Sequence, residues 1–239
     1  MVYITGDTHR LLHFEKLQKF AKSHPNLTKN DYVIIVGDCG IVWSKETLEE
    51  SIASYERLPF SVLFIDGNHE NFDLLNAYQV ENWHGGKTHK ISEHIRHLMR
   101  GQIFEIEGKT FFTLGGANST DRETRTEGLD WWKEEAPNAV EIFEANKNLE
   151  KVGYKVDYVL THTIDSWTMK NTSMAKYPFE IFMHERYLDY FDYKINYKHW
   201  YFGHFHIDEK ITDKKTSLFN KVYKLGTTPK KVYVEENIK

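Results

Sequence analysis

Five apolar segments of this chain are each followed directly by side chains of the kinds that bind metal ions. The segments cover residues 1–5, 31–36, 61–65, 156–161 and 200–203. The side chains that follow the five segments are, in order, Asp7 and His9, Asp38, Asn68 and His69, His162, and His204 and His206. Short apolar runs bounded by turn residues are typical of buried strands. Sites in an open α/β sheet form beyond the carboxyl ends of its strands, so we expect these side chains to converge.

Asp7 and His9 are two positions apart, and in an extended chain such residues project from the same face. An isolated Asp-x-His pair occurs by chance and is weak evidence for a metal site. The repetition of the same construction after four further strands makes a metal centre the better interpretation.

The convergent groups are too many for one tetrahedral ion but suit two ions that share a carboxylate. They are Asp7, His9, Asp38, Asn68, His162, His204 and His206. A set rich in imidazole favours transition ions over magnesium or calcium, which prefer oxygen ligands. We therefore expect two divalent transition-metal ions, with manganese preferred and iron, zinc, nickel or cobalt as alternatives.

The segments between the strands predict an α/β protein built from β-α-β units. Apolar residues at helical spacing predict a helix over residues 11–22, which joins the first two strands as a parallel pair. Ser44 is an expected N-cap for a helix over 45–57, and Asn138 for one reaching residue 149. Residues 102–106 and 109–114 flank Glu107 and Gly108 as the strands of a hairpin do. Residues 207–212 and 217–225 suggest a closing hairpin.

A chain of 239 residues is long enough for one core, and we expect a single domain over residues 1–239. Residues 165–197 lie between two ligand-bearing strands and contain a helix candidate over 179–191. An insertion of this length beside a site is often a lid or a specificity element, and we interpret it so.

Several other polar or aromatic groups have a structural interpretation that we prefer to a functional one. The histidines between 84 and 97, with Arg96 and Arg100, are expected on a solvated sheet face. Trp131 and Trp132 are expected to pin the preceding loop, with a stacking platform for a substrate ring as the alternative. Glu70 is expected to cap the next helix rather than position His69. A solvated face is also expected for the C-terminal lysines, which are Lys214, Lys215, Lys221, Lys224, Lys230 and Lys231.

Composition limits the function classes. The formal net charge is −4 and the pI is near 6.4, which argues against a general nucleic-acid binder. The one cysteine, Cys39, excludes an intramolecular disulfide and fits a reducing compartment. No segment approaches the ~20 apolar residues of a membrane span, and the N-terminus lacks a signal-peptide pattern. We expect a cytoplasmic protein that does not engage a membrane.

The blocks Gly6-Asp7-Thr8-His9, Gly37-Asp38, Gly67-Asn68-His69-Glu70, a lone His162 and Gly203-His204-Phe205-His206 follow strands in that order. Together they resemble the calcineurin-like metallophosphoesterase family. The resemblance implies a two-sheet mixed β-sandwich flanked by helices, with two metal ions on the loops after the strands. It assigns Asp7, His9 and His206 to one ion and Asn68, His162 and His204 to the other, with Asp38 bridging them.

The resemblance also implies a reaction. A hydroxide that bridges the two ions attacks the phosphorus of a phosphate ester, and His69 protonates the departing oxygen. Protein Ser/Thr phosphatases of this superfamily continue the second block as Gly-Asp-x-x-Asp-Arg-Gly, but here Ile41 and Val42 stand in place of the aspartate and the arginine. Arg10 and Arg122 are the best replacements for the missing arginine as a phosphate clamp.

We therefore expect a metal-dependent phosphoesterase that hydrolyses a small or exposed phosphate mono- or diester, such as a nucleotide. One alternative is a nuclease that acts on DNA or RNA, although the acidic pI disfavours nucleic acid as a partner. The other is a catalytically silent, metal-binding scaffold for protein partners. Such scaffolds typically lose ligands or the leaving-group histidine, and neither is lost here.

Overall fold

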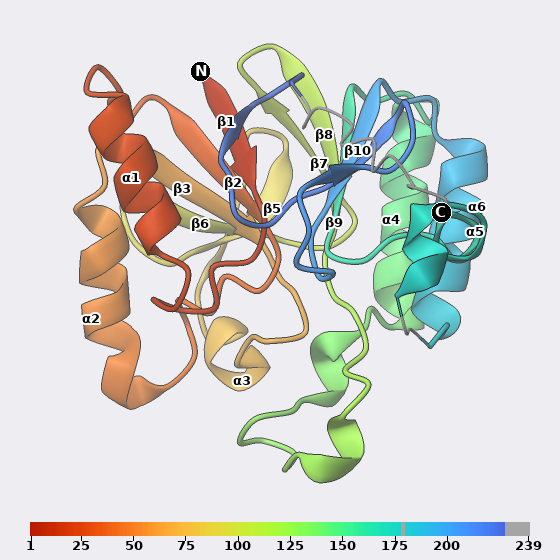
Figure 1. Cartoon of the computed structure of the whole chain (residues 1–239), viewed down its shortest axis with the longest axis horizontal. Helices are drawn as coiled ribbons and strands as arrows, with labels where there is room; N and C mark the ends of the chain where they lie inside the picture. Colours follow the sequence, from red (N-terminus) through yellow and green to blue (C-terminus); the bar gives the residue numbers. More distant parts are fainter. Residues whose placement is uncertain (178–179, 228–239) are drawn as a thin grey trace, which may run out of the picture.

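The computed structural model describes residues 1–177 and 180–227. Within them, two mixed β-sheets pack face to face (Figure 1). The first sheet has the strand order β13 (Tyr223–Lys224), β1 (Val2–Thr5), β2 (Tyr32–Val36), β3 (Ser61–Ile65), β6 (Ile95–Leu98), β5 (Gly86–Lys90), β4 (Val80–Trp83). The second has the order β11 (Glu209–Lys210), β12 (Lys215–Ser217), β10 (His199–Phe202), β9 (Tyr158–Thr161), β8 (Lys109–Leu114), β7 (Gln102–Ile106).

Helices cover the outer face of each sheet, as Figure 1 shows. On the first sheet lie α1 (Glu15–Ser23) and α2 (Lys45–Glu56), and on the second lie α4 (Ala139–Lys151), α5 (Ser166–Asn171) and α6 (Met183–Lys194). Short helical turns lie in the loops: α3 (Phe72–Leu75), η1 (Arg122–Thr124), η2 (Lys133–Glu135) and η3 (Ser173–Lys176). The predicted two-sheet sandwich flanked by helices is confirmed.

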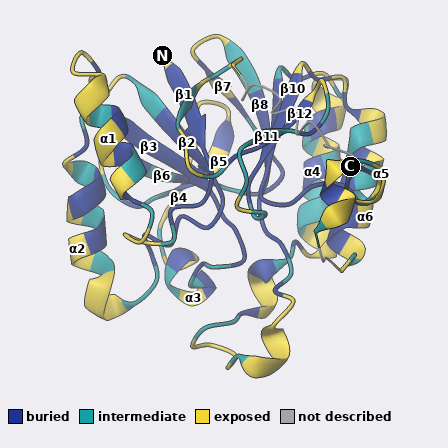
Figure 2. Ribbon diagram, in the orientation of Figure 1, coloured by how far each residue is buried: buried dark blue, intermediate teal, exposed yellow. Residues whose placement is uncertain are grey.

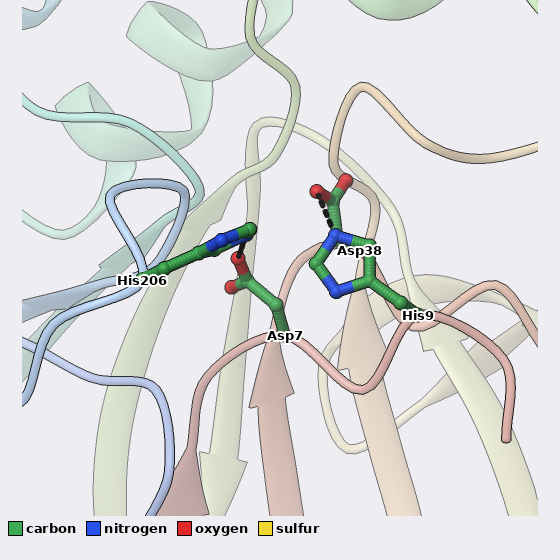
Figure 3. A group of neighbouring side chains, drawn as sticks. All are labelled: Asp7, His9, Asp38 and His206. Carbon is green, nitrogen blue, oxygen red and sulfur yellow. Dashed lines mark ion pairs between the residues drawn. The ribbon is translucent and has the colours of Figure 1, made fainter. Parts of the chain in front are cut away.

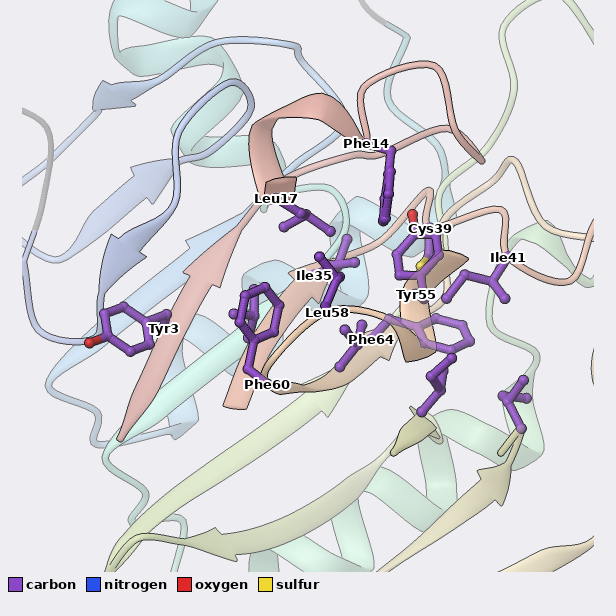
Figure 4. Close-up of a cluster of buried hydrophobic side chains, with 14 of the residues drawn as sticks. Tyr3, Phe14, Leu17, Ile35, Cys39, Ile41, Tyr55, Leu58, Phe60 and Phe64 are labelled. Atoms are coloured by element: carbon purple, nitrogen blue, oxygen red, sulfur yellow. The ribbon is translucent and has the colours of Figure 1, made fainter. Parts of the chain in front are cut away.

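The central strands β1, β2, β3, β9 and β10 are largely apolar because both faces of each sheet are covered there. Along β1 and β2, Ile4 and Ile34 point to the core between the sheets, while Tyr3 and Ile35 point to the core beneath α1 and α2 (Figure 4). This alternation follows from the two-residue period of a strand. Burial in Figure 2 is accordingly greatest along the central strands, whereas the exposed residues of the helices lie on their outer sides.

The parallel strands of both sheets end at the same edge. In the first sheet β1, β2 and β3 are parallel neighbours, and in the second β8, β9 and β10 are. The loops that follow these six strands therefore meet at one place. The segment between β8 and α4 (green in Figure 1) extends beyond this edge.

Two of three predicted elements differ in detail from the structure. The first helix begins at Glu15 rather than near residue 11, because His9 and Arg10 adopt left-handed backbone conformations with φ of 46° and 65°. The hairpin of β7 and β8 is confirmed. The closing segment forms an antiparallel pair of β11 and β12, but β13 pairs with β1 of the other sheet.

The expectation of a solvated face for the histidines between 84 and 97 is wrong for His89 and His97. Both are buried, and His97 Nε2 lies 3.0 Å from Asp66 Oδ1. Arg100, also buried, donates from Nε to Asp66 Oδ2 over 2.7 Å. Asp66 follows β3, 31 residues before His97 in sequence, so no local sequence pattern could predict that the two side chains pair.

The predicted solvated face of the C-terminal lysines is wrong for Lys215. This residue is 5 % exposed, and its ammonium lies 2.6 Å from Asp165 Oδ2 and 2.8 Å from Asp192 Oδ2. Lys230 and Lys231 lie outside the described residues. Asp165 and Asp192 belong to the 165–197 segment, so the buried ion pairs join that segment to β12.

Candidate functional site

Four of the predicted metal ligands meet where β1, β2 and β10 end. They are Asp7, His9, Asp38 and His206, and each offers a ligand atom within 4.8 Å of the others (Figure 3). Asp7 and Asp38 are buried, and His206 reaches them from the loop after β10. Sequence reasoning therefore brought together side chains that are almost 200 residues apart.

The contacts in this cluster fit a bound cation. His206 Nε2 lies 3.2 Å from Asp7 Oδ2, and His9 Nε2 lies 3.3 Å from Asp38 Oδ2. Asp7 Oδ2 is nevertheless a buried oxygen without a hydrogen-bond partner of acceptable geometry among the described residues. Two buried carboxylates in one cluster, one with an unsatisfied oxygen, are costly unless positive charge offsets them. The donor set is therefore suited to a divalent transition ion.

Asp38 faces a second group of predicted ligands with its other oxygen. His162 Nε2 lies 3.3 Å from Asp38 Oδ1 and 3.2 Å from Asn68 Oδ1. The ring of His204 lies beside that of His162, with 5.0 Å between the centroids. Asp38 thus lies between the two halves of the site, in the position that a shared ligand requires.

His162 is oriented by the backbone of β2. Its Nδ1 lies 2.9 Å from the carbonyl oxygen of Val36, so Nδ1 donates a hydrogen bond and Nε2 faces the site. Burial lowers the pKa of His162, but the carboxylates of Asp38 and Asp7 outweigh this effect and raise it to about 10. Burial and the neighbouring His162 lower the pKa of His204 to about 4. The field of the two carboxylates thus favours positive charge at the centre of the site.

The backbone of the site is strained at the predicted ligands. Positive φ angles occur at His9 (46°), Asp38 (48°), His204 (67°) and His206 (54°). Such conformations are uncommon for residues other than glycine and persist where the surroundings impose them, often at functional sites. The left-handed turns direct side chains from strand ends back toward one another.

The glycines of the sequence blocks allow the ligands to approach the backbone. A Cβ atom on Gly67 would lie 2.1 Å from Asp38 Oδ1, and one on Gly203 would lie 2.3 Å from Asp7 Oδ1. Each glycine therefore makes room for a ligand from a different block. A larger residue at either position would displace a carboxylate of the cluster.

The amide of Asn68 is held by residues that sequence reasoning missed. Its Nδ2 donates to Ser119 Oγ over 3.1 Å, which turns Oδ1 toward His162. The backbone N–H of Ser119 donates in turn to Glu135 Oε2 over 3.0 Å. Burial raises the pKa of Glu135 to about 7. Ser119 and Glu135 lie beyond β8, in a loop that carried no recognisable motif.

His69 lies next to this cluster and contacts a second residue that was missed. Its backbone N–H donates to Asp38 Oδ1 over 2.8 Å, and its ring centroid lies 5.6 Å from that of His9. The Nη1 atom of Arg125 lies 3.2 Å from His69 Nδ1. Burial lowers the pKa of His69; Asp38 opposes this shift and Arg125 adds to it.

A cleft of about 790 Å³ opens beside His9 and His69. Its lining includes Arg10, whose guanidinium lies over the ring of Trp43 at 4.7 Å, and Arg125. Arg122, the other predicted clamp, is exposed and lies over the ring of Phe182 at 5.9 Å. It is not among the residues that line this cleft, and its clamp role stays a prediction.

Two neighbouring interpretations from sequence have clear outcomes. Glu70 does not cap the next helix: its carboxylate accepts hydrogen bonds from the backbone of Cys39 (2.8 Å) and Gly40 (3.0 Å), and Asn71 caps α3 instead. The two carboxylate oxygens of Glu70 thus hold the loop that carries Asp38. Trp132 is buried and donates from Nε1 to Asp73 over 2.9 Å, as expected of a residue that pins its loop.

Comparison with known proteins agrees with this geometry. A family model for the calcineurin-like phosphoesterases matches residues 1–208. The chain belongs to the calcineurin-like phosphoesterase family. Family membership supports a metal-dependent phosphoesterase in general terms, and the buried Asp and His cluster lies where metal ions would bind.

Among solved structures, the chain is similar to the phosphopantetheinyl hydrolase from Mycobacterium tuberculosis, with 13 % identity and a TM-score of 0.43. The match covers 91 % of this chain and 87 % of that one. No curated protein matches the sequence. Among the described residues, the helices of this phosphoesterase-family chain are all too short or too polar to cross a bilayer.

Proposed function

We propose that the protein hydrolyses a small or exposed phosphate mono- or diester at a site for two divalent transition-metal ions, with manganese as the preferred ion. The observation that carries the proposal is the convergence of Asp7, His9, Asp38 and His206 within 4.8 Å. His162, Asn68 and His204 form the second half, and Asp38 faces both. The unsatisfied oxygen of Asp7 supports a cation in the first half.

The two ions, when bound, supply an activated water and offset the negative charge of the phosphoryl oxygens. The side chains of the protein would position the substrate and assist the departure of the leaving group. Asp38 holds the two halves together and anchors the backbone of His69. His69 stands on the leaving-group side, where a ring N–H donates to the departing oxygen. Arg10 lines the adjoining cleft and is the proposed clamp for phosphoryl oxygens, with Arg122 as the alternative.

The shape of the site favours small or protruding substrates. The cleft beside His69 is large enough for a group such as a nucleoside, and Trp43 offers an aromatic surface there. A bound pair of ions would attract anionic esters despite the net charge of −4. Hydrolysis of p-nitrophenyl phosphate and bis-p-nitrophenyl phosphate with added manganese tests the proposal and separates monoesterase from diesterase activity.

Asp38→Asn should lose activity and at least one metal ion, because its carboxylate faces both halves of the site. The measurement is metal content after dialysis together with the rate on both esters. Asp213→Asn, at an exposed aspartate between β11 and β12, is the control and should retain both. Full activity of Asp38→Asn would refute the proposed centre.

The alternatives predict other outcomes of the same assay. Turnover of single-stranded or duplex DNA in preference to both small esters would favour the nuclease. Stoichiometric metal binding without hydrolysis of any phosphate ester would favour the scaffold.

A further inference from the structure

Arg125 lines the cleft, and each nitrogen of its guanidinium has a polar partner. Its Nε and Nη2 atoms donate to the two carboxylate oxygens of Asp121 over 2.8 and 2.9 Å. Its Nη1 donates to the backbone oxygen of Asp130 over 3.1 Å and lies 3.2 Å from His69 Nδ1. Such a bidentate pair fixes the plane of the guanidinium, so the atom that faces His69 is well placed.

The chemistry of the guanidinium decides the direction of this contact. Arginine has five N–H donors and no acceptor, so His69 Nδ1 must accept. The hydrogen of the ring is then on Nε2, the other nitrogen. The carboxylate that the superfamily's protein phosphatases place in this role is absent, since position 41 is a buried isoleucine. A carboxylate would accept a hydrogen bond from Nδ1, which is the opposite direction.

We propose that Arg125 is the positioning residue of His69, and that it makes His69 a neutral Nε2–H hydrogen-bond donor to the leaving group instead of a proton donor. The preferred substrates are then phosphate compounds whose leaving group departs as a stable anion. Phosphoanhydrides and aryl phosphates belong to this class, whereas simple alkyl phosphates do not. This inference rests on the proposed phosphoesterase function and narrows its substrates.

The bond changes show why the leaving group matters. The oxygen of water forms a bond to phosphorus, and the bond from phosphorus to the leaving oxygen breaks. The leaving oxygen keeps the electron pair, and the protons of water go to the product phosphate and to solvent. A phosphate or phenolate leaving group is stable as this anion. An alkoxide is not, and would need a proton, which a neutral imidazole gives up far less readily than an imidazolium ion.

The charges of the cleft suit a negatively charged leaving group. Arg125 is neutralised by Asp121, but Arg10 forms no ion pair with a carboxylate among the described residues. Its guanidinium lies over Trp43 and lines the same cleft as His69. The phosphate that leaves an anhydride carries a negative charge that this arginine can offset, whereas an uncharged alcohol would gain nothing there.

A series of leaving groups tests the role of His69 in the metal-loaded enzyme. We expect kcat/KM to fall as the pKa of the leaving group rises from nitrophenyl through phenyl to alkyl phosphates, and a diphosphate to be cleaved in preference to the alkyl esters. His69→Ala should keep its metal ions and lose on the order of 10² in rate, by the same factor for every substrate, because one hydrogen-bond donor is lost. A loss that grows with the pKa of the leaving group would identify a general acid and overturn the proposal.

The tautomer can be observed without turnover. In protein labelled with ¹⁵N-histidine and loaded with diamagnetic zinc, His69→Gln identifies the ring signals of His69. We expect the Nε2–H form, and we expect Arg125→Gln to change it, with partial recovery in Arg125→Lys. Arg57→Gln, at an exposed arginine after α2, is the control and should leave these signals unchanged. A proton on Nδ1, or no response to Arg125→Gln, would overturn the positioning role.

One further variant keeps the outcomes separate. Asp121→Asn loosens Arg125 without touching His69 and should shift the same signals in the same direction, which covers the case that Arg125→Gln does not fold. If the metal-loaded protein hydrolyses no phosphate compound, the proposed function fails. Even in that case, the tautomer experiment tests whether Arg125 donates a hydrogen bond to His69 Nδ1.

Discussion

At the scale of residues, the orientation of Asn68 depends on a chain of hydrogen bonds that begins outside the sequence blocks. An amide is a ligand through its oxygen, and a flipped amide would present an NH₂ group to the metal. Ser119 prevents the flip by accepting from Nδ2, and Glu135 holds the backbone of Ser119. Residues that orient ligands in this way influence metal affinity almost as much as the ligands themselves.

We predict that Ser119→Ala weakens metal binding at the proposed site of Asn68, His162 and His204 by about 10- to 100-fold, while the other proposed site is affected less. Zinc titration by calorimetry or with a competing chelator measures both affinities. Ser173→Ala removes a comparable serine hydrogen bond at the surface, to Glu209, and serves as the control. Unchanged affinity at both sites in Ser119→Ala would show that the amide needs no support.

At the scale of elements, the 165–197 segment has a structural role besides its predicted role as a lid. Leu188 and Phe191 of α6 and Met169 of α5 are buried against the second sheet. Deletion of the segment would therefore remove part of a core. Tyr177 and Phe182 border a pocket of about 290 Å³ that His204 also lines, so substitutions there are the appropriate test of the lid.

A change of substrate profile with unchanged metal content is the result expected of Tyr177→Ala and Phe182→Ala if the segment selects substrates. The measurement is the ratio of kcat/KM for an aryl phosphate and a bulky phosphodiester. Trp167→Ala, at an exposed residue of α5, is the control. Equal ratios in all of these variants would reject the lid.

The buried lysine that ties this segment to β12 gives a stability prediction. Lys215→Met should destabilise the protein by about 3–5 kcal/mol, because the buried Asp165 would lose the cation that compensates its burial and the half-buried Asp192 would lose its ion pair. Lys214→Met is the matched control: Lys214 is exposed over the ring of Tyr197, and its loss should cost less than about 1 kcal/mol. Urea unfolding of both variants measures the difference, and equal stabilities would contradict the role of the ion pairs.

At the scale of the whole molecule, the site joins the two sheets. Asp7, Asp38 and Asn68 follow strands of the first sheet, and His162, His204 and His206 follow strands of the second. Bound ions would therefore link both halves of the sandwich, and they have no comparable site in the unfolded chain. Metal binding should accordingly contribute to the stability of the entire fold.

We predict that manganese or zinc raises the unfolding temperature of protein stripped with a chelator, and that the rise continues with the logarithm of the metal concentration. At a concentration 100 times the dissociation constant, the gain is about 2.7 kcal/mol for one ion. Differential scanning calorimetry over a metal series measures it. Asp38→Asn should show a smaller rise, and equal rises in both proteins would place the stabilising ions elsewhere.

The sequence by itself predicted the five strands that precede the candidate ligands, and the structure has a strand at each of these places. This was possible because a buried strand followed by Gly and a ligand is a local pattern, and because parallel strands bring their ends to one edge. The cap of α4 was equally local: Asn138 Oδ1 accepts from Val140 and Glu141 as expected.

Only the tertiary structure decided which residues support these ligands. Arg125, Ser119 and Glu135 act on His69 and Asn68 through partners 16 to 56 residues away, on loops without regular periodicity. Burial, too, is a property of the packed chain, which is why Lys215 and its exposed neighbour Lys214 cannot be told apart in the sequence. Local patterns place groups at the ends of strands, but contacts between distant loops determine how those groups are oriented and what charge they carry.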